Sequence, residues 1–415
     1  MKDFLQYFLN WKDCVVMSSN CILPWISIET TPLGNVRPCC LYREELPGID
    51  LKTHTLEQAF NSKSMRDLRR KFRRGERPEN CRNCWREEDA GKKSKRMYML
   101  EKFKHEKVDY SSNNGVELKF LDLKLGNICN LKCRICGSWS SSKWAKEELE
   151  YVPKELQHAH IAIKWLKDGM WPRKSPSFWD NLDELLPQIK YFEFTGGEPW
   201  MIQEHFDLLS RAVDRGYAKD IDIHYNTNTT QYPKDPTIWR HFKHVQIAFS
   251  VDNTEERFEY ERFGANWQTA NENINKVHEL RKQGYPIATQ LCCTWNIQNI
   301  MYLDEVLTWA DTMNFDTLHF NILHDPWELS LSRVPVFARQ QIMLYLQKQQ
   351  IIHRKYKNDI ISLKNLITHA NESDHTYGVV DPKYLYNKIR KADLYRNQNF
   401  AISHTKIAKV IKYEL

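Results

Sequence analysis

Residues 124–139 read KLGNICNLKCRICGSW and place Cys129, Cys133 and Cys136 in a C-x3-C-x2-C loop. Three thiolates from one short loop can hold three irons of a [4Fe-4S] cube and leave the fourth iron open to an external ligand. An open coordination position is typical of a catalytic metal centre. A zinc knuckle and buried free thiols are the alternatives for this motif when it is taken alone. The sequence around the loop must therefore decide between them.

From about residue 117 onward, short β-rich runs alternate with longer amphipathic segments. We predict strands at 117–125, 189–195, 220–227, 245–252, 286–295 and 317–323. We predict helices at 138–150, 178–188, 202–216, 234–242, 267–283 and 302–313. This alternation predicts right-handed crossovers and a parallel sheet, with functional residues at the carboxyl ends of the strands. The expected fold class is α/β, a partial (β/α)6 TIM-like barrel with the cysteine loop directly after its first strand.

A second motif, FTGGEPW at residues 194–200, follows the second predicted strand. Gly196 and Gly197 let the backbone approach a ligand closely, and their N–H groups together with the Glu198 carboxylate can grip a ligand ammonium. Alone, GGEP is also compatible with a plain turn that carries a solvated glutamate. Its position downstream of the cysteine loop, at the end of a strand, favours the ligand role.

Together these two motifs resemble the radical S-adenosylmethionine (SAM) superfamily. The resemblance implies a [4Fe-4S] cluster on Cys129, Cys133 and Cys136, with SAM at the open iron. It implies reductive cleavage of SAM to a 5′-deoxyadenosyl radical that abstracts hydrogen from a substrate. The SAM contacts that the resemblance implies are Ile135, Gly196, Gly197, Glu198, Thr227, Asn228, Ser250, Asp252, Arg262 and Asn296.

Some of these contacts have structural alternatives. Ser250 and Asp252 also suit a helix cap or a turn, and Arg262 also suits an ion pair with Glu259 or Glu261 on a surface helix. In the TNG-like turn of the family, this chain has Thr229 in the usual glycine position. Separately, the adjacent pair Cys292 and Cys293 is interpreted as small buried side chains instead of ligands.

The amino-terminal part contains a second group of cysteines, in CILPWISIETTPLGNVRPCC at 21–40 and PENCRNCW at 78–85. Cys21, Cys39, Cys81 and Cys84 supply four thiolates, which suits a closed structural site for an iron-sulfur cluster or for zinc. Adjacent residues on a strand point to opposite faces, so Cys39 and Cys40 are not expected to bind one metal together. The spacing favours Cys39, with Cys40 as the alternative.

The spacing C-x12-G-x4-C, from Cys21 through Gly34 to Cys39, resembles the SPASM and Twitch auxiliary-cluster domains of radical SAM enzymes. No further cysteine follows closely after Cys84, so the resemblance implies one auxiliary [4Fe-4S] cluster, as in Twitch. In the family this module usually follows the barrel, whereas here it precedes it. We expect three regions: 1–112 as the Twitch/SPASM-like domain, 113–330 as the radical SAM core and 331–415 as a helical extension.

Composition limits the remaining function classes. The net charge is +7, the eleven cysteines are an odd number, and no export signal or membrane-length apolar run is found, so we expect a cytoplasmic protein with metal or redox chemistry and no membrane partner. Basic runs are interpreted as solvated helix faces, and a nucleic acid is not the expected partner.

The resemblance suggests a peptide or protein substrate and an electron donor such as flavodoxin or ferredoxin. One alternative is a radical SAM dehydrogenase or rearrangement enzyme for a sugar or nucleotide. The alternative from another class, a zinc-binding adaptor associated with nucleic acid, leaves GGEP unexplained.

Overall fold

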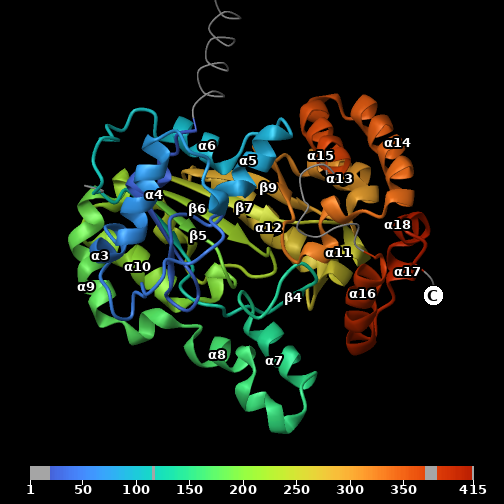
Figure 1. The fold of residues 1–415 in the computed structure, drawn as a ribbon, viewed down its shortest axis with the longest axis horizontal. Coiled ribbons are helices and arrows are strands. Elements are labelled where there is room, and N and C mark those ends of the chain that lie inside the picture. The colour runs from blue at the N-terminus through green and yellow to red at the C-terminus, as the bar shows by residue number, and fades with distance from the viewer. Residues whose placement is uncertain (1–18, 115–116, 370–380, 414–415) are drawn as a thin grey trace, which may run out of the picture.

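The computed structural model describes residues 19–114, 117–369 and 381–413. Its centre is an eight-stranded sheet with the order β10-β9-β7-β6-β5-β3-β1-β2 (Figure 1). All six predicted strands are present, as β3 (Phe120–Leu123), β5 (Tyr191–Phe194), β6 (Asp222–Thr227), β7 (His244–Ser250), β9 (Ile287–Trp295) and β10 (Thr317–Ile322). They lie in chain order and pair in parallel. The predicted α/β class with its parallel sheet is confirmed.

Two further strands, β1 (Ser27–Thr30) and β2 (Val36–Arg37), extend this sheet from the amino-terminal segment. β1 pairs in parallel with β3, and β2 is antiparallel to β1. The central sheet therefore has two strands beyond the six predicted for the core. β1 is wholly buried, and its backbone groups are satisfied by pairing with β3.

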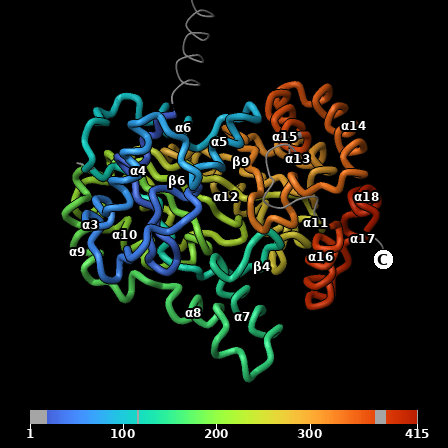
Figure 2. Tube along the Cα trace, in the orientation of Figure 1, coloured from blue at the N-terminus to red at the C-terminus, as the bar shows by residue number. Residues whose placement is uncertain are grey.

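Helices follow the core strands much as predicted. They are α7 (Ser142–Glu150), α8 (Ile161–Asp168), α9 (Pro176–Leu185), α10 (Gln203–Asp214), α11 (Glu255–Glu261), α12 (Trp267–Lys282) and α13 (Leu303–Met313). The short segment predicted at 234–242 is a 3-10 helix at Pro236–His241. Figure 2 shows that the segment with α7 and α8, which follows the cysteine loop, projects away from the sheet.

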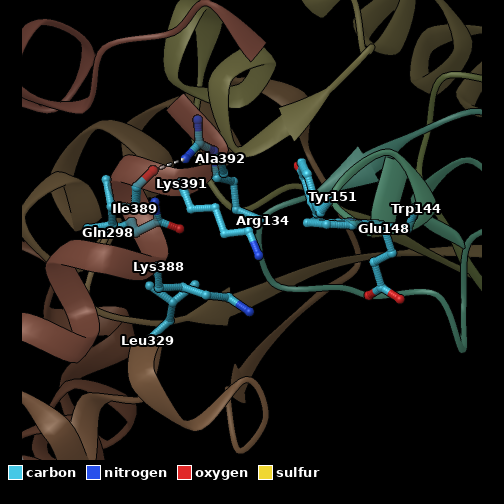
Figure 3. A pocket seen from close by; sticks show the side chains of 10 residues that line it. All are labelled: Arg134, Trp144, Glu148, Tyr151, Gln298, Leu329, Lys388, Ile389, Lys391 and Ala392. Atoms are coloured by element: carbon cyan, nitrogen blue, oxygen red, sulfur yellow. Dashed lines mark hydrogen bonds between the residues drawn. The ribbon is translucent and has the colours of Figure 1, made fainter. Parts of the chain in front are cut away.

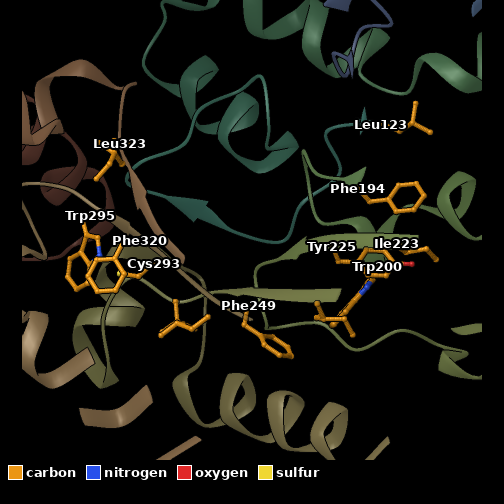
Figure 4. Close-up of a cluster of buried hydrophobic side chains, with 14 of the residues drawn as sticks. Leu123, Phe194, Trp200, Ile223, Tyr225, Phe249, Cys293, Trp295, Phe320 and Leu323 are labelled. Carbon is orange, nitrogen blue, oxygen red and sulfur yellow. The ribbon is translucent and has the colours of Figure 1, made fainter. Parts of the chain in front are cut away.

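One face of the sheet is apolar and packs against these helices. Phe194, Tyr225, Phe249 and Trp295 belong to one large buried cluster on this face (Figure 4). Because strand side chains alternate between faces, every second residue of each strand contributes to it. This cluster holds the helical layer against the sheet.

The opposite face of the sheet is polar. Glu29, Asp122, Glu193, His224 and Gln246 occupy paired register positions on β1, β3, β5, β6 and β7. In a closed eight-stranded barrel, the equivalent face is filled with layers of branched apolar side chains. Charged and hydrogen-bonding groups in this row therefore mark a face built for polar contacts.

The remaining helices belong to the amino-terminal and carboxyl-terminal parts of the chain, which meet where the Asn365 side chain donates to the Ala90 carbonyl. The amino-terminal set is α2 (Leu23–Ile26), α3 (Leu56–Phe60), α4 (Lys63–Arg73), α5 (Arg82–Asp89) and α6 (Lys95–Lys102). The carboxyl-terminal set is α14 (Val336–Ile352), α15 (Lys357–His369), α16 (Lys383–Arg396), α17 (Phe400–Ser403) and α18 (Thr405–Val410). Figure 1 shows α3 and α4 at one side of the sheet and α14 to α18 at the other.

Within the described residues, no helix combines the length and apolar character that crossing a membrane requires. Cys14 lies outside the described residues.

Candidate active site

The cysteine loop leaves the carboxyl end of β3 and returns along the two-residue strand β4 (Lys132–Cys133). Cys129 and Cys133 are buried, Cys136 is half-buried, and the three group around Leu131. Burial is the main cause, and the nearby Cys133 thiol the second, of a raised pKa for both Cys129 and Cys136. The pKa of Cys136 reaches about 12. Thiols in such a place are neutral unless a positive centre compensates their ionisation. The loop is therefore chemically suited to a metal cluster.

The GGEP turn packs directly against this loop. Gly196 and Gly197 have positive φ angles of 71° and 58°, and the Glu198 N–H donates to the Ile128 carbonyl over 2.8 Å. A Cβ at Gly197 would lie 2.6 Å from the same carbonyl oxygen. Glycine is thus required here both for the backbone conformation and for close contact between the two predicted motifs.

We expect Gly197→Ala to separate these motifs. Backbone strain at a positive φ costs about 1–3 kcal/mol, and the contact with the Ile128 carbonyl adds to it. Gly216→Ala is the matched control, because Gly216 has a φ of 80° and no atom within 4 Å of the added Cβ. Unfolding in denaturant should show a larger loss of stability for Gly197→Ala. Equal losses would contradict the contact between the motifs.

Glu198 connects the GGEP turn to the end of β6. Its carboxylate is fully buried and accepts hydrogen bonds from the Thr227 hydroxyl over 2.9 Å and from the Asn228 N–H over 2.7 Å. Burial raises the pKa of Glu198 to about 7, although these hydrogen bonds favour the charged form. Glu198 therefore holds the turn after β6 against the GGEP turn through Thr227 and Asn228.

This raised pKa predicts a pH dependence of stability. The folded pKa of Glu198, about 7, lies above the unfolded value of roughly 4.3. The resulting stabilisation is complete below the unfolded pKa and is lost as pH rises through the folded one. Because Glu198→Gln cannot ionise, the free energy of unfolding of the wild type relative to this variant should decrease between roughly pH 4 and 7. A difference that stays constant in urea unfolding at several pH values would contradict this assignment.

The turn after β6 reaches the cysteine loop. The Asn228 amide nitrogen lies 3.6 Å from the Cys129 sulfur and 3.0 Å from the Asn130 side-chain oxygen. Thr229 has a φ of 68°, so threonine adopts the left-handed conformation that glycine usually supplies.

Asp252 and Arg262 form a buried ion pair next to the same loop. Arg262 Nη2 lies 2.5 Å from Asp252 Oδ2, and Arg262 Nη1 lies 3.8 Å from the Cys133 sulfur. Arg262 belongs to the short strand β8 (Arg262–Phe263), which pairs with β4. The alternative of a surface pair with Glu259 or Glu261 is therefore wrong, because strand pairing turns Arg262 inward.

The other predicted contacts differ in exposure. Ser250 is half-buried at the end of β7, and Ile135 is partly buried against the main core. Asn296 is fully buried, and both ends of its amide bond backbone groups, the Thr294 carbonyl and the Gln298 N–H. The structure thus gives Asn296 a role in shaping the turn after β9. Cys292 and Cys293 are both buried, as interpreted.

The amino-terminal cysteines form a second group. Burial raises the pKa of the thiols of Cys21, Cys39, Cys81 and Cys84. Charge interactions with neighbouring cysteines raise the pKa of Cys21, Cys39 and Cys81 further. The pKa reaches about 12 for Cys39 and about 11 for Cys84. Cys40 points elsewhere, and its sulfur lies 3.0 Å from the Lys95 ammonium. The geometry therefore favours Cys39 over Cys40 as the fourth member.

Lys95 is a buried residue that sequence reasoning missed. Its ammonium lies 3.1 Å from Asp122 and 2.9 Å from Glu193, besides its contact with Cys40. In the described residues, Cys40, Asp122 and Glu193 are the one trio of metal-ligating groups whose ligand atoms lie within 4.8 Å of one another. The Lys95 ammonium already supplies the positive charge at this position. A lysine among many others in a basic stretch gave no signal of this role.

A cavity of about 140 Å³ lies between the cysteine loop and the carboxyl-terminal helix α16 (Figure 3). Arg134 and Trp144 border it on one side, and Lys388 and Ile389 of α16 on the other. Gln298 also borders it, and both of its amide atoms are buried without a hydrogen-bond partner among the described residues. The carboxyl-terminal extension therefore takes part in the surroundings of the loop.

Comparison with known proteins identifies the amino-terminal part. Residues 21–85 match the model of the SPASM family, described as an iron-sulfur cluster-binding domain. The chain therefore carries a SPASM-type iron-sulfur cluster-binding domain, and the matched residues include Cys21, Cys39, Cys81 and Cys84. The expected SPASM-like module in the amino-terminal part of the chain is confirmed. No curated protein matches the chain.

Solved structures with similar arrangements include anSMEcpe with bound AdoMet and Cp18Cys peptide, at 15% identity and a TM-score of 0.36. That match covers 58% of this chain and 61% of the other. Another is Streptococcus suis SuiB bound to the precursor peptide SuiA, at 14% identity and a TM-score of 0.36, covering 67% of this chain and 52% of SuiB. This chain thus spans between half and two thirds of the length of these two proteins.

Proposed function

We propose that this protein is a radical SAM enzyme that abstracts hydrogen from a peptide or protein substrate, assisted by one auxiliary [4Fe-4S] cluster. The observation that carries the proposal is the contact between three motifs that lie far apart in the sequence. Glu198 hydrogen-bonds the cysteine loop through its N–H and the β6 turn through its carboxylate. A zinc knuckle needs neither of these partners.

In this proposal Cys129, Cys133 and Cys136 hold the core cluster, and Cys21, Cys39, Cys81 and Cys84 hold the auxiliary one. A core cluster with an open iron supplies the electron and the binding position for reductive cleavage of SAM to a 5′-deoxyadenosyl radical.

The protein's own groups would orient the cofactor. Gly196 and Gly197 bring the backbone of the GGEP turn directly against the loop, while Asp252 holds the Arg262 guanidinium close to Cys133. A fixed cation next to a coordinating sulfur also favours the ionised thiolate. These groups therefore prepare the loop for an anionic cluster and for the charged amino-acid end of SAM.

The polar face of the sheet supports a substrate that is rich in hydrogen-bonding groups. Ser250, Gln290 and Asn321 lie on neighbouring strands, on the same side as Glu193 and His224 by strand alternation. Amide and hydroxyl side chains match the N–H and C=O groups of a peptide. An electron donor such as flavodoxin or ferredoxin completes the proposal.

One experiment tests the enzymatic core of this proposal. The protein is purified without oxygen, reconstituted with iron and sulfide, and incubated with SAM and dithionite. We expect release of 5′-deoxyadenosine and about eight irons per chain, the content of two four-iron clusters. No release from a protein shown to carry its core cluster would contradict the proposal. Zinc bound at the amino-terminal cysteines would contradict only the auxiliary cluster.

A further inference from the structure

Arg134 lies inside the cysteine loop, between Cys133 and Cys136, but its side chain turns toward helix α16. It donates to the Ile389 carbonyl over 3.3 Å (Figure 3) and to the Asp393 carboxylate over 2.5 Å. Its side chain is only 3% exposed. A guanidinium that donates to several acceptors at once fixes its own orientation. The cysteine loop is thus attached to an element about 250 residues further along the chain.

Asp393 is the centre of this attachment. Its Oδ1 accepts from Arg134 and from the Tyr260 hydroxyl over 2.7 Å, and its Oδ2 accepts from the Phe400 N–H over 2.8 Å. The Arg134 guanidinium also stacks on the Tyr260 ring, 3.9 Å from its centroid. One carboxylate therefore joins the cysteine loop, the end of α11 and the start of α17.

A second buried ion pair ties α16 to the element that follows the loop. Arg396 lies 2.9 Å from Glu147 of α7, and both side chains are 3% exposed or less. Glu147 also pairs with Lys132, which precedes Cys133, and the Trp144 indole donates to the Cys133 carbonyl over 2.8 Å. The two residues Asp393 and Arg396, less than one helical turn apart, thus hold both flanks of the loop.

We propose that α16 positions the cluster loop, and that Asp393 is the positioning residue through which it acts on Arg134 and so on Cys133 and Cys136. The inference rests on the proposed function. Buried pairs are costly to break, because removing one partner leaves the other charge uncompensated. Asp393 touches no cysteine, so its effect reaches the cluster only through the backbone that carries the thiols. The carboxyl-terminal extension is then a working part of the SAM site.

The test uses the full-length, reconstituted protein and three readouts: iron content, SAM dissociation constant, and the electron paramagnetic resonance spectrum of the reduced clusters with and without SAM. Asp393→Asn should weaken SAM binding at least tenfold and remove the SAM-dependent change of the core-cluster spectrum. The auxiliary-cluster signal should stay unchanged. Arg134→Lys keeps the charge but loses the fork, and should give an intermediate effect.

Asp381→Asn is the matched control, because Asp381 forms an exposed ion pair with Lys383 just before α16. It should behave like the wild type. SAM binding and a spectral change equal to wild type in Asp393→Asn, even with a lower melting temperature, would overturn the inference, as would an equal loss in Asp381→Asn. If Asp393→Asn fails to assemble its core cluster, Arg134→Lys is judged by the same criteria. A wild type without any SAM-dependent change would instead refute the proposed function itself.

Discussion

A chain in which Cys129, Cys133 and Cys136 are all replaced by alanine is expected to lose about half of its iron and all cleavage of SAM. The loss follows from the proposed function, in which each thiolate holds one iron of the core cluster, because a cluster without protein ligands does not assemble. The amino-terminal cysteines lie in residues 21–85, which match the SPASM family, and none of them belongs to the cysteine loop, so their share of about four irons should remain. Iron analysis and 5′-deoxyadenosine release measure the two effects on one preparation.

Two further variants make this result specific. Cys292→Ala removes a thiol that is also buried, on β9, and should leave iron content and cleavage unchanged. Replacing Cys81 and Cys84 together should remove the other half of the iron. An unchanged iron content in the triple variant, or an equal loss in Cys292→Ala, would show that the cysteine loop does not hold a cluster.

Replacing Lys95 with methionine should strongly destabilise the contact between the amino-terminal module and the central sheet. The Lys95 ammonium is the shared partner of Asp122 and Glu193, which lie side by side on β3 and β5. Methionine has a similar length but no charge, so two buried carboxylates lose this compensating cation. Breaking a buried ion pair from one side costs about 3–5 kcal/mol. Denaturant unfolding of the variant and the wild type measures the loss.

Lys93→Met is the control for this change. Lys93 precedes the same helix and pairs with Glu101. Both side chains of this pair are much more exposed than that of Lys95. Surface pairs contribute about 0–1 kcal/mol, so Lys93→Met should be close to neutral. If the two variants lose the same stability, the buried charge cluster does not hold the module in place.

The core strands were predictable because each carries a strong local pattern. The run from 286 to 295 is apolar and β-branched, and it appears as β9 within one residue of the predicted bounds. The run at 189–195 forms β5, within two residues of the predicted bounds. Such patterns mark these strands because the face that packs against the helical layer needs apolar side chains at every second position. The place of β1 in this sheet depends on its pairing with β3, a contact that its own four residues do not reveal.

The candidate site was likewise predictable only in part. The identity and spacing of Cys129, Cys133 and Cys136, the GGEP turn, and the four amino-terminal cysteines were evident from the sequence. The partners that connect them were not, because Glu198 and Asn228 interact across about thirty residues, and Arg134 and Asp393 across 259. Contacts of such sequence separation leave no periodic trace in either segment.

The sequence by itself determined the α/β fold, the order of its core strands and the residue types that suit two metal clusters, since these depend on local spacing and strand periodicity. Only the tertiary structure places the Cys39 thiol near Cys21, Cys81 and Cys84 and the Cys40 thiol beside Lys95, because the direction of a side chain is set by its three-dimensional surroundings. It also decided that Arg262 turns inward to Asp252, and that α16 holds the cysteine loop. A buried charge is costly unless it is paired, and only the folded chain brings these partners within hydrogen-bonding distance.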